Sequence, residues 1–215
     1  MEDRHIELDE LAIEIANRAT KATGTSLSSI PSLSQLTASG EPSPAMLMSS
    51  LAGEMVTHAT RLLRERRYRD AAAVFEFGVQ GDPYNAAFHN NWGFCLIPED
   101  AHEALPHLQH AEELSYFHSG LNAYNQMCCL VELGRRRAAL ALAERIWARR
   151  HSLPSDKCTI WRHHGSSWVL EPTHDIFRDI AEFAAATADA ETTGHEADIW
   201  RRRLAESEQQ SPGGD

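Results

Sequence analysis

Lysine is almost missing from this sequence of 215 residues, in which Lys21 and Lys157 are the only two. The other basic residues are arginines, a bias typical of GC-rich bacterial genomes. The formal net charge is −11. Because binding to nucleic-acid phosphates requires a basic surface, this balance excludes broad affinity for nucleic acid. Residues 51–150 carry 12 acidic and 11 basic residues, so most of the negative charge lies in the two flanks.

Long apolar runs and a leader-like N-terminus are missing too. No hydrophobic run approaches the length that spans a membrane. The first residues lack the basic region and apolar stretch of a secretory signal. The cysteines are few and not spaced as a disulfide framework, which predicts reduced, packed thiols; they are Cys95, Cys128, Cys129 and Cys158. We therefore expect a cytoplasmic protein without a membrane partner.

What the sequence does contain is a repeat with a period of 34 residues, between residues 52 and 150. Asn91 and Asn125 are one period apart, and Ala71 and Ala139 are two periods apart. Small residues hold fixed helical positions in the repeat: Ala59, Ala71, Gly93, Ala104 and Ala139. This pattern resembles the tetratricopeptide repeat (TPR) superfamily, in which each unit is a pair of antiparallel helices. The resemblance implies an all-α fold, a solenoid of helical hairpins with three degenerate repeats.

The rest of the chain is expected to extend this solenoid at both ends. Residues 1–43 are expected to form an amphipathic helix, at 5–22, followed by a Ser/Pro-rich linker. Residues 44–152 are expected to form the repeat domain. Its helices are predicted at 44–66, 69–80, 86–97, 101–115, 120–133 and 136–150. Residues 153–206 are expected to begin with an irregular segment, with at most a short strand at 168–170, and to continue in two helices that cover the last repeat. Residues 207–215 are predicted to be a disordered tail.

The resemblance also implies a binding groove lined by the first helix of each repeat, which takes a peptide or a helix. Transferred position by position, its partner-binding residues are Arg64, Asn90, Phe94, Leu121, Tyr124 and Cys128. Arg64 is the only basic residue of this set, so we expect no clamp for the C-terminal carboxylate of a peptide. The apolar residues favour an amphipathic helix or an apolar peptide as the ligand. In the alternative interpretation, Phe94 and Tyr124 are core residues. Residues 5–36 are themselves a candidate ligand for this groove, in the same chain or in a second copy. The simpler interpretation is that their helix caps the first repeat.

A run of arginines forms the second candidate for a partner site. These residues are Arg61, Arg66, Arg67 and Arg69, next to Arg64. Their positive charge suits an acidic partner, including the acidic flanks of this chain. The simpler interpretation is a solvated edge of the first repeat.

Two patterns keep an enzymatic alternative open. The spacing of Arg145 and His151 resembles that of HEPN-type ribonucleases, which are also helical. Zinc-type ligands lie at Cys158, His163, His164 and His174, and a second histidine group at His102, His107 and His110, but neither matches a closed zinc-site spacing. We expect a protein–protein interaction module, an adaptor, chaperone or regulatory subunit, without catalytic residues, metal or cofactor. The alternatives are a helical nuclease or metal-dependent hydrolase, and a self-associating scaffold such as a homodimer.

Overall fold

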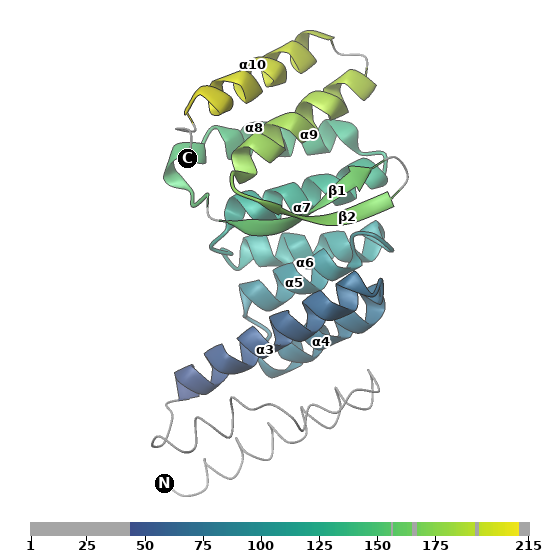
Figure 1. Ribbon diagram of the computed structural model, residues 1–215, viewed down its shortest axis with the longest axis vertical. Helices are drawn as coiled ribbons and strands as arrows, with labels where there is room; N and C mark the ends of the chain where they lie inside the picture. Colours follow the sequence, from purple (N-terminus) through teal and green to yellow (C-terminus); the bar gives the residue numbers. More distant parts are fainter. Residues whose placement is uncertain (1–43, 156, 165–166, 192–193, 211–215) are drawn as a thin grey trace, which may run out of the picture. The chain divides into compact units, whose positions relative to one another are not determined.

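The chain is mostly helical in the residues that the computed structural model describes, which are 44–155, 157–164, 167–191 and 194–210 (Figure 1). This part of the chain forms eight α-helices and one two-stranded sheet. The chain divides between Pro83 and Tyr84 into two compact units. The amphipathic helix expected at 5–22, the linker up to residue 43 and residues 211–215 lie outside the described residues.

The described part of the first unit, from residue 44 on, forms one pair of packed helices, α3 (Pro44–Arg64) and α4 (Tyr68–Gly81). Helix α3 begins at Pro44, as predicted, because proline suits the first turn of a helix. The turn after it places Arg66 at φ +59°, and the amide of Arg67 donates to the carbonyl of Leu62 at 2.9 Å. The left-handed residue thus closes the helix and starts the return of the chain.

The described residues of the second unit form six α-helices, and each packs against the next along the chain. They are α5 (Ala86–Leu96), α6 (Ala101–Glu113), α7 (Ser119–Glu132), α8 (Arg136–Trp147), α9 (Ile176–Ala190) and α10 (Gly194–Gln210). Capping side chains fix three of the starts: Asn85 for α5, Asp100 for α6 and Asp175 for α9, and each accepts from backbone amides of the first turn. Helices α5 to α8 lie within a few residues of the predicted ranges.

Helices α5 and α6 approach each other most closely at Gly93. A Cβ atom at this position would lie 2.7 Å from Cγ of Leu108 and 2.8 Å from the carbonyl oxygen of Ala104. The lack of a side chain therefore allows the two backbones to pack. At the end of α7, Gly134 takes φ +69° and reverses the chain into α8.

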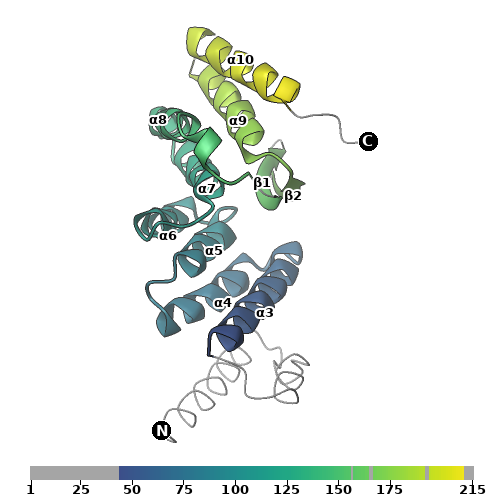
Figure 2. The same cartoon turned by 90° about the vertical axis from the view of Figure 1, so that its left-hand side faces the viewer.

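The segment expected to be irregular is a β-hairpin, which corrects the sequence-based prediction. Strand β1 (Cys158–His164) pairs antiparallel with β2 (Ser167–Thr173), with Ile160 opposite Glu171. Strand β1 packs against α7, and α9, which follows β2, packs against both α7 and α8. Figure 2 shows the hairpin beside α7 and α9. The two strands are rich in β-branched and aromatic residues, which favour a pleated conformation.

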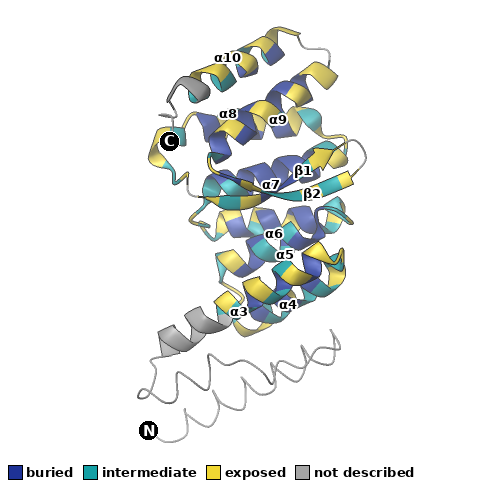
Figure 3. Ribbon diagram, in the orientation of Figure 1, coloured by how far each residue is buried: buried dark blue, intermediate teal, exposed yellow. Residues whose placement is uncertain are grey.

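Helix α7 is the centre of the second unit. Ten of its fourteen residues are buried, and Figure 3 shows the buried residues along almost its whole length. Helix α10 continues to Gln210, so the tail predicted for 207–215 begins too early. In the described part of the chain, no helix has the length and apolar character needed to cross a membrane.

Candidate functional site

Trp161 of β1 lies against the helix face that was predicted to bind a partner. Its indole Nε1 donates to the carbonyl of Phe94 at 2.8 Å, and its ring stacks on the Phe94 ring with centroids 5.5 Å apart. The hydroxyl of Tyr124 donates to the carbonyl of Trp161 at 3.0 Å. Trp161 is 2% exposed. The chain thus places one of its own strands over Phe94 and Tyr124.

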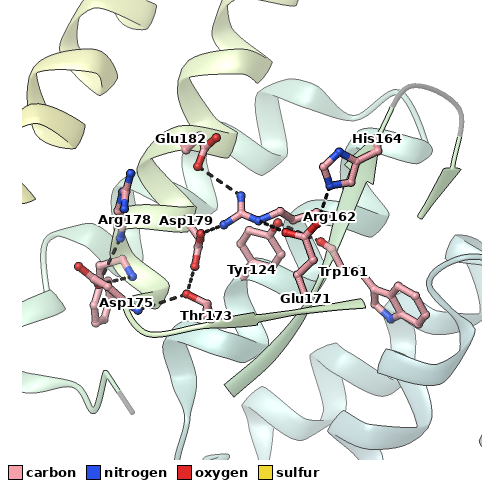
Figure 4. Close-up of polar contacts among 11 residues, drawn as sticks. Tyr124, Trp161, Arg162, His164, Glu171, Thr173, Asp175, Arg178, Asp179 and Glu182 are labelled. Carbon is pink, nitrogen blue, oxygen red and sulfur yellow. Dashed lines mark hydrogen bonds and ion pairs between the residues drawn. The ribbon is translucent and has the colours of Figure 1, made fainter. Parts of the chain in front are cut away.

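The next residue of β1, Arg162, joins the hairpin to α9 (Figure 4). Its guanidinium contacts Asp179, donates to Glu182 at 3.2 Å through Nη1, and pairs with Glu171 at 3.0 Å through Nε. The carboxylate of Asp179 also accepts from the hydroxyl of Thr173. Burial raises the pKa of Asp179 above its ordinary value, and its contacts with Thr173 and Arg162 oppose that shift. This cluster holds the hairpin in place, because each strand and α9 contribute to it.

A row of buried amides crosses from α5 to α7. The side chain of Asn122 donates to Oδ1 of Asn90 at 3.1 Å and to the carbonyl of Leu108 at 3.0 Å. Gln126 donates to Oδ1 of Asn122 at 2.7 Å and to Oε2 of Glu112 at 2.9 Å. Amides that satisfy each other in a low-dielectric interior fix the register of the helices. The row ends at the surface, at Glu112.

Glu112 marks one side of an open cleft of about 460 Å³ between α6, α7 and α8. Residues 115–117, between α6 and α7, and residues 149 and 152–154, which follow α8, complete its wall. Its polar lining includes Glu112, Asn122, Arg145 and Arg149, and its apolar lining includes Tyr116, Phe117, Leu142, Ile146 and Leu153. Cavities of this size are typical of ligand and peptide sites.

The cleft carries more positive than negative charge. Nη2 of Arg145 lies 2.9 Å from Oε1 of Glu112, whose other oxygen accepts from Gln126, so this carboxylate is satisfied. The guanidinium of Arg149 has no hydrogen bond or ion pair with another described residue. Burial raises the pKa of Tyr116 to about 12, with a smaller effect of Cys158, so its phenol stays a neutral donor near pH 7. The cleft therefore offers free donors without a free acceptor charge.

The residues predicted to line an open groove have different positions in the structure. Asn90, Tyr124 and Cys128 are at most 2% exposed, and Phe94 and Leu121 are half-buried. Burial raises the pKa of both the Tyr124 phenol and the Cys128 thiol. The core interpretation of Tyr124 agrees with this burial, and the side chains of Asn90, Tyr124 and Cys128 do not lie open to a partner. Arg64 is exposed in the first unit.

The predicted arginine edge is partly neutralised by local acids. Arg61 pairs with Glu65 at 3.3 Å, and Arg67 pairs with Asp70 at 2.7 Å. Arg66 and Arg69 are exposed. Exposed pairs of this kind contribute little to stability, so these residues form a solvated, mixed-charge edge of the first unit.

The residues of the enzymatic alternative do not form a catalytic pair. Arg145 engages Glu112, and His151 is an exposed residue of the short 3₁₀ turn Arg150–Ser152 that does not line the cleft. His163 lies near Glu132 at 3.8 Å, and His164 contacts Glu171 at 2.7 Å. Among the residues with described positions, no group of three or more His, Cys, Asp or Glu side chains is arranged to hold a metal ion.

In the second histidine group, His107 and His110 contact other rings and His102 is exposed. His107 stacks on Trp92 with centroids 3.8 Å apart, and His89 lies edge-on to His110 at 4.5 Å. Burial, with the nearby His89 and His110, lowers the pKa of His107, and Glu103 opposes this. His107 is thus kept neutral as a packing residue between α5 and α6.

Sequence reasoning missed the hairpin, the Arg162 cluster and the cleft. A signal for the hairpin existed: Gly165-Ser166 separates two runs that contain Ile160, Trp161, Trp168 and Val169. No local signal identified the cleft, because its residues come from the ends of separate helices.

Comparison with known proteins does not assign the chain to a family. No protein-family model matches the chain, and none of the curated proteins is similar enough to count as a match.

Proposed function

We propose that the chain is a TPR-like protein–protein interaction module, an adaptor, chaperone or regulatory subunit that works in the cytoplasm. The helical-repeat part of the proposal is supported by the consecutive packed helix pairs and by the close approach at Gly93. Cys95, Cys128 and Cys129 are buried thiols that form no disulfide among the described residues, which suits a reducing compartment.

The observation that carries the binding function is the open cleft beside Phe117. The side chain of Phe117 is 69% exposed, although large aromatic side chains are normally covered. It lines a cleft of about 460 Å³ that also contains Arg145 and Arg149. Aromatic and arginine side chains supply most of the binding energy in protein interfaces. The proposed partner site is therefore this cleft rather than the face that β1 covers.

The test is affinity capture from the native host lysate with the full chain, its Phe117→Glu variant and its Tyr84→Glu variant. Tyr84 is 81% exposed and lies outside the cleft, so it controls for the loss of an exposed aromatic residue. We expect a protein that the wild type and Tyr84→Glu retain and Phe117→Glu loses, and that binds the purified chain directly. Equal capture by all three variants would move the site elsewhere. If the wild type captures no protein at all, that result would contradict an interaction module. Capture of the chain itself would indicate a self-associating scaffold.

A further inference from the structure

The residues that line the cleft beside Phe117 indicate the charge of the ligand that it binds. Its charged residues are Glu112, Arg145 and Arg149. Both oxygens of Glu112 are already engaged, Oε1 in an ion pair with Arg145 and Oε2 as the acceptor of a hydrogen bond from Gln126. The guanidinium of Arg149 is left without an acceptor among the described residues. A free guanidinium in a partly enclosed space favours an anionic ligand with planar oxygens.

The backbone around Arg149 is held in place. Its amide donates to the carbonyl of Ile146 at 3.0 Å, and its own carbonyl accepts from the amide and the hydroxyl of Ser152, both at 2.9 Å. Arg149 therefore projects from a fixed turn at the end of α8, so that less freedom is lost when its side chain binds.

The cleft also has an apolar part next to these donors. Phe117 and Leu153 line it together with the ring of Tyr116. A ligand that fits both parts carries a negative charge beside an apolar side chain. Among protein segments, this is an acidic residue with an aliphatic or aromatic neighbour.

We propose that this cleft binds an acidic peptide segment of a partner protein, with its carboxylate on Arg149 and the neighbouring apolar side chain on Phe117. The inference rests on the proposed function and names the chemistry of the partner at the same site. Glu112 acts against the ligand in this arrangement, because its charge repels a second carboxylate and occupies Arg145.

The test uses an array of amidated hexapeptides with one Asp or Glu next to each apolar residue type, each paired with its Asn or Gln counterpart. The full chain is expected to retain a subset of acidic peptides and none of the matching amides. For the best peptide, fluorescence anisotropy of Arg149→Gln should show roughly tenfold weaker binding, because a charged hydrogen bond is lost. Arg149→Lys keeps the charge but not the planar pair of donors, so it should recover only part of the affinity.

Two further variants separate this proposal from damage to the fold. Arg135→Gln removes an exposed charge at the other end of α8, outside the cleft, and should leave the affinity unchanged. Glu112→Gln should tighten binding by about two- to fivefold, because it removes a negative charge that competes with the peptide for the arginines. The expected gain corresponds to the interaction energy of an exposed ion pair. Structural damage does not produce tighter binding.

Three results would overturn the proposal. The first is an array without retained acidic peptides, and the second is equal retention of acidic and amide peptides. The third is unchanged affinity in Arg149→Gln. If host capture still depends on Phe117 in any of these cases, the interaction function stands and only the acidic ligand is excluded. A phosphoserine arm of the same array distinguishes a phosphopeptide, and preference for it over the carboxylates would also reject the proposal.

Discussion

At the scale of single residues, Gly93 decides how closely α5 and α6 pack. A methyl group at this position would meet the carbonyl oxygen of Ala104 at 2.8 Å, and this backbone atom cannot move aside without shifting α6. Alanine has the higher helix propensity, by up to about 1 kcal/mol. Overpacking of a core costs about 1–3 kcal/mol, so the steric term is larger. We expect Gly93→Ala to lower the free energy of unfolding, measured by urea denaturation.

Gly53 provides the matched control at this scale. It lies inside α3, and a Cβ atom there would meet nothing within 4 Å. Gly53→Ala should therefore raise the free energy of unfolding by up to about 1 kcal/mol, through helix propensity alone. Equal effects of the two substitutions would show that α5 and α6 do not meet at Gly93.

At the scale of elements, Trp161 joins the β-hairpin to α5 and α7. Its ring and its indole nitrogen engage Phe94, and its carbonyl accepts from Tyr124. Truncation of a buried tryptophan costs about 3–5 kcal/mol. We expect Trp161→Ala to lower the free energy of unfolding by this amount in urea denaturation, and to increase the binding of a hydrophobic dye at the uncovered face. Val169→Ala, at a 39% exposed position of the same hairpin, should change stability by less than about 0.5 kcal/mol. If Trp161→Ala were as mild as this control, the hairpin would not be part of the core.

The same element shows what the sequence could and could not predict. Helices α4 to α8 follow from local signals, namely apolar periodicity and turn residues such as Gly134. The hairpin was missed because both of its faces have partners: Trp161 packs on Phe94, and Arg162 on the opposite face binds Asp179. Each face mixes apolar and polar residues, such as Ile160 beside Arg162, so the alternation that marks a strand is blurred. The role of Tyr124 depended on this strand, so its burial was not predictable either.

At the scale of the whole molecule, the division at Pro83 and Tyr84 gives the clearest prediction. Every contact of the hairpin described above lies in the second unit. Ion pairs also join α8 to α10 there, from Arg203 to Glu144 at 2.6 Å and from Arg137 to Glu196 at 3.2 Å. A fragment of residues 84–215 therefore keeps the packing of α5 to α10, and we expect it to fold cooperatively by itself.

The tryptophans make this prediction measurable in the full chain as well. All five lie after Tyr84, so their fluorescence reports on the second unit, whereas far-UV circular dichroism reports on the helices of both. In the fragment, the two signals should change together in urea, as expected for a two-state domain. In the full chain, the fluorescence should again follow a single transition. A fragment that unfolds gradually, or whose fluorescence changes before its helices melt, would mean that the second unit requires residues before Tyr84 in order to fold.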